Sequence, residues 1–327
     1  MRKLLFLPSR NLSLTIPMVI LAGFMAGLTV NTSGLNQYIL PVTILMIYPI
    51  MIGIKTEEIF TPSHNKLLLV SLGINFIIIP LLAYLLGTFF LLGDTYLFAG
   101  LAIASILPTS NMSIAFTMFA RGNVAASIKL TVIGLILGAI LAPWYLLLMV
   151  GRYLPMDVWA TTKLVGLLVL LPLTMGILTH GLLLRRYSRD HFESRIKPYL
   201  PAISTWGALY IVFTSISMNA HRVIAEPRLL LMGLLVQVIF YGINYAITIK
   251  IGRTFFERKD AIALVYGTAL RNLSISVGLA ATAFGPHAAL MVSLAFLLQG
   301  QAAAWFCRLF EKNRILPEKI NHAGVGL

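Results

Sequence analysis

Long apolar stretches alternate with short polar connections along the whole chain. Each stretch holds about 20 residues with few charges, which is enough for a helix to cross the roughly 30 Å hydrocarbon core of a bilayer. The pattern therefore predicts an all-α polytopic membrane protein. Ten transmembrane helices are expected, over residues 13–30, 38–54, 67–92, 95–120, 123–150, 158–184, 199–219, 229–251, 260–284 and 287–308.

The composition agrees with this pattern and narrows the chemistry. Of the 327 residues, 58% are hydrophobic and 11% are charged, and the mean hydropathy is +0.88. A soluble domain carries about 25% charged residues. The single cysteine, Cys307, excludes an intrachain disulfide and a cysteine-based metal cluster. Because the sequence offers no metal cluster and no nucleophile–base pair at depth, we expect neither an enzyme nor a cofactor.

Basic residues are distributed unevenly between the two sides of the predicted helices. Of the 25 Lys and Arg residues, 19 fall on one side, three on the other and three inside spans. Since loops rich in Lys and Arg stay in the cytoplasm, this predicts a multi-pass protein of the cell inner (plasma) membrane with both termini cytoplasmic. The net charge of +14 then reflects topology. The expected partners are the lipid bilayer and a small-molecule or ionic solute, without nucleic acid, and the oligomeric state is left open.

Two short matches relate the halves of the chain. GINF at 73–76 in the third predicted helix resembles GINY at 242–245 in the eighth, and NMSI at 111–114 in the fourth resembles NLSI at 272–275 in the ninth. Each half holds five helices, an odd number, so the second half enters the membrane inverted. Inverted repeats with a site between them near the midplane are typical of secondary transporters.

The transporter domain, 1–327, is therefore expected to consist of a first inverted repeat, 1–152, and a second, 153–327, which ends in a cytoplasmic tail. Pro108 predicts a break in the fourth helix, because it removes a backbone donor and restricts the residue before it. Gly267 precedes a polar run in the ninth helix, where the repeat predicts a second break. Two broken helices that cross bring together half-helix ends, whose N-termini favour anions and whose C-termini favour cations.

Polar residues gather at and behind the two expected breaks. Arg271 stands out, because it lies far from either membrane face and no acidic residue lies in the middle of a span. Taken singly, such residues are interpreted as hydrogen-bonding contacts between helices. As a set, they favour a transport site. The candidates are Asn75, Thr109, Ser110, Asn111, Ser113, Asn244, Gly267, Thr268, Arg271 and Asn272.

One motif carries a resemblance to a known family. It reads P-x-x-x-x-S…A-R-G-N-V-A-x-S-x-x-x-T, here Pro108, Ser113, the run 120–125, Ser127 and Thr131. On this motif the chain resembles the bile acid:sodium symporter superfamily, which also contains the arsenite permeases. The resemblance implies two inverted five-helix repeats. It also implies a mobile panel of helices one, two, six and seven, and a core in which helices four and nine are broken and crossed.

The resemblance also implies where sodium ions would bind. Ser113, Ser127 and Thr131 match ligands of the first ion in the sodium symporters, whereas Ile114 replaces an asparagine. At the second sodium site the chain differs from the symporters at more positions. No resident metal is therefore expected, and Asn75 joins these three residues as a degenerate sodium-site position.

Asn75 stands where the symporters have a second-site glutamine, Gly267 replaces the glutamate shared by both sites, and Arg271 replaces another glutamine. The guanidinium of Arg271 is expected to substitute for an ion, donating to Asn75, to Ser and Thr hydroxyls and to carbonyls freed at the break. Two roles stay open for it. Arg271 either braces the crossing or also meets an anionic substrate.

We therefore expect a secondary transporter that moves a small anionic organic solute by alternating access, with weakened or absent sodium coupling. Three alternatives stay open. The first is an arsenite or antimonite efflux permease, since residues 46–54 resemble that branch, although Thr109 stands where its functional cysteine lies. The second is a sodium-coupled bile-acid-type organic anion symporter. The third, from another class, is a non-transporting membrane receptor or scaffold.

Overall fold

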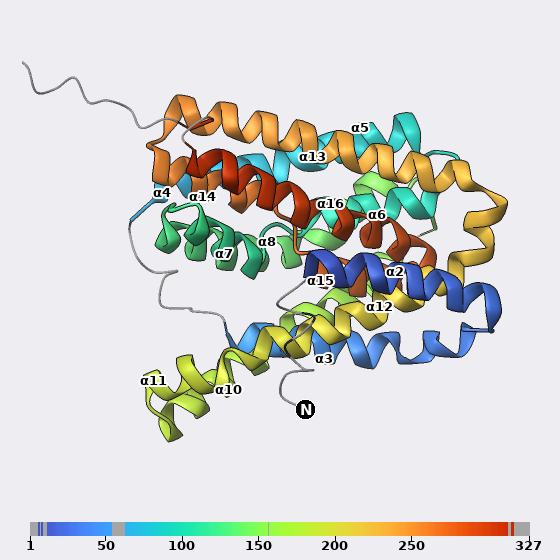
Figure 1. The fold of residues 1–327 in the computed structure, drawn as a ribbon, viewed down its shortest axis with the longest axis horizontal. Coiled ribbons are helices and arrows are strands. Elements are labelled where there is room, and N and C mark those ends of the chain that lie inside the picture. Colours follow the sequence, from blue (N-terminus) through green and yellow to red (C-terminus); the bar gives the residue numbers. More distant parts are fainter. Residues whose placement is uncertain are drawn as a thin grey trace, which may run out of the picture.

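The protein is almost entirely helical in the described part of its computed structural model, which comprises residues 6, 8, 12–53, 63–155, 157–312 and 315–316 (Figure 1). In the first half the elements are α2 (Leu12–Thr29), η1 (Ser33–Tyr38), α3 (Ile39–Ile52), α4 (Asn65–Gly73), η3 (Ile74–Ile78), α5 (Ile79–Phe90), α6 (Thr95–Ile106), α7 (Asn111–Phe119) and α8 (Val124–Val150). In the second half they are α9 (Val158–Val165), η4 (Gly166–Leu170), α10 (Leu171–Arg186), α11 (Arg189–His191), η5 (Phe192–Ile196), α12 (Tyr199–Ala225), α13 (Pro227–Phe255), α14 (Arg258–Ala269), α15 (Leu273–Ala283) and α16 (Pro286–Glu311).

Among the described residues, seven helical segments are long and apolar enough to cross a membrane. They are Ser33–Ile52, Asn65–Phe90, Val124–Val150, Trp159–Arg186, Arg189–Ala225, Pro227–Phe255 and Pro286–Glu311. Three shorter apolar helices, Leu14–Thr29, Thr95–Ile106 and Leu273–Ala283, lie in other stretches where the sequence predicts spans. The protein is therefore a multi-pass membrane protein, as predicted, while the ten-helix inverted repeat stays a prediction.

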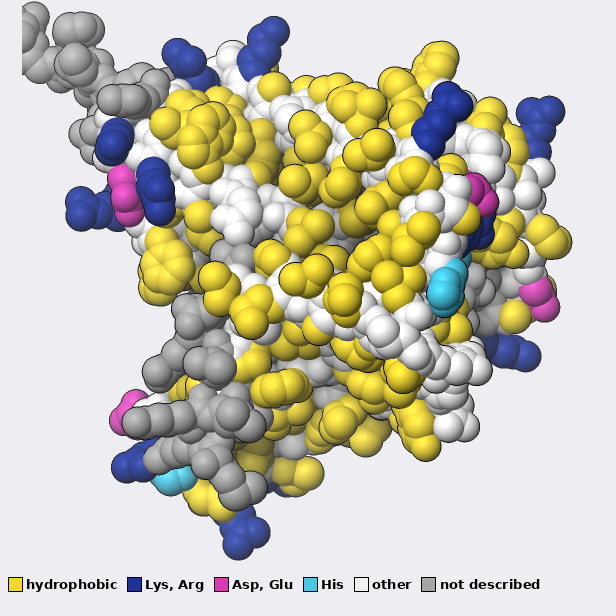
Figure 2. Space-filling view, turned by 45° about the vertical axis from the view of Figure 1, so that its right-hand side comes forward, with side chains coloured by type: hydrophobic (Ala, Val, Ile, Leu, Met, Phe, Trp, Pro, Cys, Tyr) yellow, Lys and Arg dark blue, Asp and Glu magenta, His cyan; other side chains and the backbone are white. Residues whose placement is uncertain are grey.

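The surface has the character of a lipid-facing one. Figure 2 shows hydrophobic side chains over most of one face, with Lys and Arg toward its edges. Large apolar side chains such as Phe89, Leu148 and Trp159 are each more than 70% exposed. Such a continuous apolar surface would be unfavourable in water but matches hydrocarbon.

The helices form two groups. In one, which we call the panel, α12 packs along α2 and α3, and α3 packs against α10. In the other, the core, α13 packs on α14, α15 on α16, and α6 against α5, α8 and α16. Figure 1 shows α3, α10 and α12 below α7, α13 and α14. The two groups also contact each other, α12 against α16 and α15 against α3.

Glycines permit close helix crossings within each group. A Cβ atom on Gly27 would lie 2.0 Å from the Ser217 carbonyl oxygen, where α2 crosses α12 in the panel. A Cβ atom on Gly100 would lie 2.2 Å from the Ala288 carbonyl oxygen, where α6 meets α16 in the core. Small residues at helix interfaces are a common basis of packing in membranes, because apolar burial alone gains little between helices there.

Candidate functional site

Two helices of the core are interrupted at depth, and the interruptions pair with each other. The chain is extended between α6 and α7 and again between α14 and α15. Across the two breaks, the Thr109 amide donates to the Leu270 carbonyl and the Asn272 amide to the Leu107 carbonyl, both at 3.0 Å. These bonds satisfy backbone groups that the breaks would otherwise leave free in the membrane. Both predicted breaks are therefore present, and they cross at one point.

The backbone at the first break is strained. Thr109 has a φ of 56°, in the left-handed region that β-branched residues rarely adopt. Its side chain is buried, and its hydroxyl donates to the Thr131 carbonyl at 3.3 Å. A conformation of this kind persists only where the surroundings enforce it. Here the bonds to Leu270 of the second break and to Thr131 of α8 hold it in place.

The half-helices α7 and α15 start at this crossing with side-chain caps. The Ser110 hydroxyl accepts from the Met112 amide at 3.2 Å, and the Ser113 hydroxyl accepts from the Ser110 amide at 3.2 Å. At the other break, the Asn272 side chain accepts from the Ile275 amide at 3.3 Å. Three predicted site residues thus serve as helix caps. The side chain of Asn111 lies outside the described part of the structure.

The Arg271 side chain is fully buried behind the crossing. Its Nε donates to the Ala104 carbonyl at 3.1 Å and its Nη2 to the Ser105 carbonyl. Its Nη1 donates to the Thr268 carbonyl at 3.1 Å and to Asn75 Oδ1 at 2.5 Å. The three carbonyls belong to the last turns of α6 and α14, where helix carbonyls lack partners and the helix dipole is negative. The guanidinium therefore caps both half-helices at their C-terminal ends.

Two asparagines, one from each half of the chain, hold the end of α14. Asn75 lies in the π-helical turn η3, and its Nδ2 donates to the Gly267 carbonyl at 3.1 Å and to Ser71 Oγ at 3.2 Å. Asn244 Nδ2 donates to the Thr268 carbonyl at 3.1 Å. Five predicted site residues thus have their side-chain or carbonyl contacts behind the crossing: Asn75, Asn244, Gly267, Thr268 and Arg271.

Gln299 is a site residue that the sequence reasoning missed. Its Oε1 accepts from the Arg271 backbone amide at 2.8 Å and from the Tyr241 hydroxyl at 2.9 Å. Its Nε2 donates to the Arg271 carbonyl at 3.1 Å. The Gln299 side chain therefore hydrogen-bonds both backbone groups of Arg271 at the second break. A signal was present, since a glutamine in the middle of an apolar span needs a hydrogen-bonding partner.

The positions that match the first sodium site lie together and bond to one another. The Thr131 hydroxyl donates to the Ser127 carbonyl at 2.8 Å. The Thr117 hydroxyl donates to the Ser113 carbonyl at 2.7 Å and lies 3.2 Å from Ser127 Oγ. All four side chains are buried. Within the described residues, no group of three or more His, Cys, Asp or Glu side chains is placed to hold a metal ion.

Gly267 lies against this cluster. A Cβ atom there would lie 3.0 Å from Leu130 Cδ1, on α8. An apolar side chain thus occupies the space that a side chain at position 267 would enter. The hydroxyl cluster therefore has no carboxylate from position 267 beside it.

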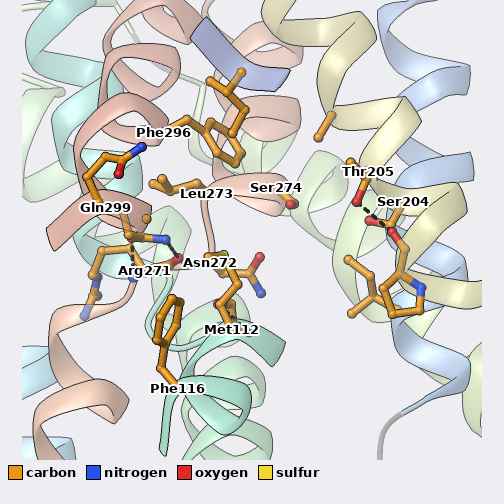
Figure 3. Close-up of a pocket in the computed structure, with 17 residues that line it drawn as sticks. Met112, Phe116, Ser204, Thr205, Arg271, Asn272, Leu273, Ser274, Phe296 and Gln299 are labelled. Carbon is orange, nitrogen blue, oxygen red and sulfur yellow. Dashed lines mark hydrogen bonds between the residues drawn. The ribbon is translucent and has the colours of Figure 1, made fainter. Parts of the chain in front are cut away.

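A cavity of about 160 Å³ lies on the open side of the crossing, between panel and core (Figure 3). Ser110 and Asn272, the two caps, line it together with Ser274. Ser204 and Thr205 face them from α12 of the panel. In Figure 3 the Arg271 side chain extends away from Ser274 and Thr205. The backbone of Arg271 therefore borders the cavity while its guanidinium points behind the crossing.

A second cavity of about 370 Å³ lies beside the first. Both are lined by Ile50 of α3 and Pro201 of α12. The second is also lined by Gly53, Val124 and Lys197, which lie at the end of the molecule that carries the connection 185–197. The two cavities thus form a cleft between panel and core at that end.

The fold and the site define a class of protein. A polytopic helical chain with two interrupted helices that cross at depth, beside a cleft between two helix groups, has the architecture of a membrane transporter. The chain belongs to the Sodium Bile acid symporter family, whose family model matches residues 40–227. The family and its named relatives are transporters rather than enzymes.

Three relatives illustrate the breadth of the family. The chain is 25% identical over 260 residues to the uncharacterized protein YbaS of Bacillus subtilis (78% of this chain, 82% of YbaS). It is 25% identical over 232 residues to the probable sodium/metabolite cotransporter BASS3, chloroplastic, of Oryza sativa subsp. japonica (69% of this chain, 52% of that protein). It is 21% identical over 285 residues to the arsenical-resistance protein Acr3 of Corynebacterium glutamicum (82% of this chain, 75% of Acr3).

Proposed function

We propose that the protein moves a small organic anion across the inner membrane by alternating access of the cavity between panel and core, with sodium coupling weak or absent. The observation that carries the proposal is the convergence of two helix N-termini, those of α7 and α15, on one cavity. The positive ends of helix dipoles and their free amides favour a carboxylate or similar group.

The remaining lining supports a small organic solute. Apart from the Arg271 backbone, the lining residues of the 160 Å³ cavity are uncharged. The hydroxyls of Ser110, Ser204 and Thr205 supply hydrogen-bonding groups, and the rings of Phe116 and Phe296 supply apolar surface. A site of this type orients a ligand with a few polar contacts and holds it through apolar burial.

Weak sodium coupling is supported by three features of one region. Gly267 removes the shared carboxylate, Leu130 fills the adjacent space, and Arg271 supplies a covalently attached cation that bonds to the half-helix ends. A sodium ion placed near that guanidinium would meet charge repulsion and few free oxygen ligands. The inverted-repeat architecture and cytoplasmic termini, inferred from the internal matches and the basic residues, belong to the same proposal.

Uptake into proteoliposomes tests the proposal. Radiolabelled monocarboxylates, keto acids and sulfonates selected by thermal shift should enter vesicles that contain the protein, and exchange of sodium for choline should change the rate by less than about twofold. The variant Ser274→Leu, in the cavity, should reduce uptake, whereas Ser194→Leu, in the distant connection, should not. A steep sodium dependence, or uptake by no anion tested, would contradict the proposal.

Arsenite is a second candidate substrate, because Acr3 is similar over most of this chain. The position after Pro108 is Thr109, and Cys307 is buried on α16, outside the cavity lining. A thiolate is thus missing from the site. Arsenite transport that persists in the Cys307→Ser variant would favour this candidate.

A further inference from the structure

Panel and core are joined by a polar cluster at the end of the molecule opposite the open cleft. Asp94 caps α6 and His287 begins α16, both in the core, while Asn219 and Arg222 lie on α12 of the panel. His287 Nε2 lies 2.6 Å from Asp94 Oδ2, and His287 Nδ1 lies 2.8 Å from Asn219 Oδ1. Arg222 Nη2 donates to Asp94 Oδ2 at 3.0 Å. We call these four residues the outer latch.

The orientation of the Asn219 amide is fixed by its other contacts. Asn219 Nδ2 donates to the Ser215 carbonyl at 2.7 Å and to the Pro286 carbonyl at 3.2 Å. The opposite atom, Oδ1, is therefore the oxygen, which can only accept a hydrogen bond. It follows that His287 Nδ1 carries a proton.

The other ring nitrogen of His287 also faces an acceptor. Asp94 accepts from Arg222 and, through Oδ1, from the Leu97 amide at 3.2 Å, as an ionised carboxylate does. Burial raises the pKa of Asp94, but the hydrogen bond and charge of His287, the Leu97 amide and Arg222 outweigh it and lower that pKa from its ordinary value. A neutral imidazole has one donor and one acceptor nitrogen, so only the doubly protonated ring satisfies both contacts.

We propose that His287 is a proton-binding site of the closed outer latch, and that uptake of one proton locks the panel helix α12 against the core. Movement of α12 away from the core would separate Asn219 and Arg222 from His287 and Asp94. Water then replaces the amide, and a neutral imidazole no longer faces two fixed acceptors. The meaning of this latch for transport rests on the proposed alternating access, but the latch itself does not.

The surrounding charges are consistent with this assignment. Tyr96 of α6 packs edge-on against the His287 ring at 6.1 Å, and Glu226, at the end of α12, lines the small groove beside it. The side chain of Arg222 is 44% exposed, so its charge is screened by solvent, whereas that of Asp94 is 1% exposed. The buried carboxylate is the dominant neighbour of the ring.

The sign of the pH dependence follows from where the proton is bound. The closed latch holds one proton more than the open one, so closure is favoured as the pH falls and is lost as the pH rises. One proton changes the closed-to-open ratio by at most about tenfold per pH unit.

Distance measurements with spin labels test the latch without a substrate. In a Cys307→Ser background, cysteines at Ile224 on the panel and Leu92 on the core, 57% and 47% exposed, would carry the labels in nanodiscs. The short-distance population should grow at least tenfold relative to the long one from pH 8 to pH 5. His287→Gln should reduce this change to less than about twofold. His221→Gln, an exposed histidine on α12 outside the latch, is the matched control and should keep the response.

Three outcomes would overturn the inference: an absence of pH response in the parent protein, an unchanged response in His287→Gln, or a response lost equally in His221→Gln. If His287→Gln fails to fold, Asn219→Leu, which removes one acceptor from the panel side, should weaken the response instead. A pH response without any solute uptake would support the latch and contradict the proposed function. Anion uptake with pH-independent distances would support the proposed function and contradict the latch.

Discussion

At the residue scale, Arg271 shows how a membrane protein can bury a cation without an acidic partner. The bonds found for its guanidinium go to three carbonyls and one amide oxygen. The carbonyls end two helices, so their partial negative charge is concentrated at one place. Removing the guanidinium would leave those carbonyls without hydrogen-bond donors, which costs free energy in a low-dielectric interior. The residue is therefore integral to the crossing.

Arg271→Gln should destabilise the protein and weaken binding of charged and neutral ligands alike. The free energy of unfolding should fall by about 1.5–3 kcal/mol, the value of a hydrogen bond to a charged group. Binding should fall equally for an anion and its neutral isostere, because the guanidinium points away from the cavity. Thermal unfolding and isothermal titration with both ligands measure this. A loss at least tenfold larger for the anion would instead indicate direct contact with the substrate.

Gln299→Leu should loosen the same crossing by a different route. It removes the bonds to the Arg271 amide and carbonyl while it keeps the guanidinium in place. We expect a loss of about 1–3 kcal/mol, because two buried backbone groups lose their partners. Arg308→Gln, further along α16, exposed and outside the cavity lining, is the control on the same helix. Equal losses in the two variants would argue against a specific role for Gln299.

At the element scale, some features could be predicted from the sequence and others could not. Pro108 predicted the first break because its ring and missing amide act locally. The second break was inferred from the repeat, and the structure has it at the expected place. The roles of Gln299 and of the outer latch could not be predicted, because they depend on which helices face each other. Asp94 in particular reads as an ordinary helix cap until His287 is found beside it.

The half-helix region also shows what a sodium site would require. The double variant Gly267→Glu with Arg271→Gln has the symporter residues at both positions. Sodium should stabilise it little, because Leu130 occupies the space beside position 267. Adding Leu130→Ala should let the carboxylate approach the hydroxyls of Ser127 and Thr131. Only this triple variant should be stabilised by sodium relative to choline. Its free energy of unfolding should rise by about 2.7 kcal/mol when the sodium concentration is 100 times the Kd. Sodium stabilisation of the double variant would show that Leu130 moves aside.

At the scale of the whole molecule, panel and core touch at one end and separate at the other. The outer latch joins them at the α12–α13 turn, and the cleft lined by Ile50 and Pro201 lies toward the connection 185–197. An arrangement open at one end only is one state of an alternating-access cycle. The basic residues of the connection make the open side the cytoplasmic one in our proposal.

Accessibility labelling checks this orientation. In the Cys307→Ser background, Ile114→Cys in the wide cavity should react with a membrane-impermeant thiol reagent applied from the cytoplasmic side. Leu97→Cys, which is buried at the latched end, should remain unreactive from either side. In inside-out and right-side-out vesicles, labelling of Ile114→Cys from the outside alone would reverse the assigned topology.

The attached cation of Arg271 has a consequence for energetics. A sodium ion enters and leaves with its cargo, but a guanidinium stays with the protein through every cycle. A monovalent anion carried without a cation therefore moves one net negative charge per turnover. At a membrane potential of 100 mV, negative inside, that charge is worth about 2.3 kcal/mol, equivalent to a concentration ratio of roughly 50-fold. In the proposed cycle, the potential would drive such an anion out of the cell without any sodium gradient.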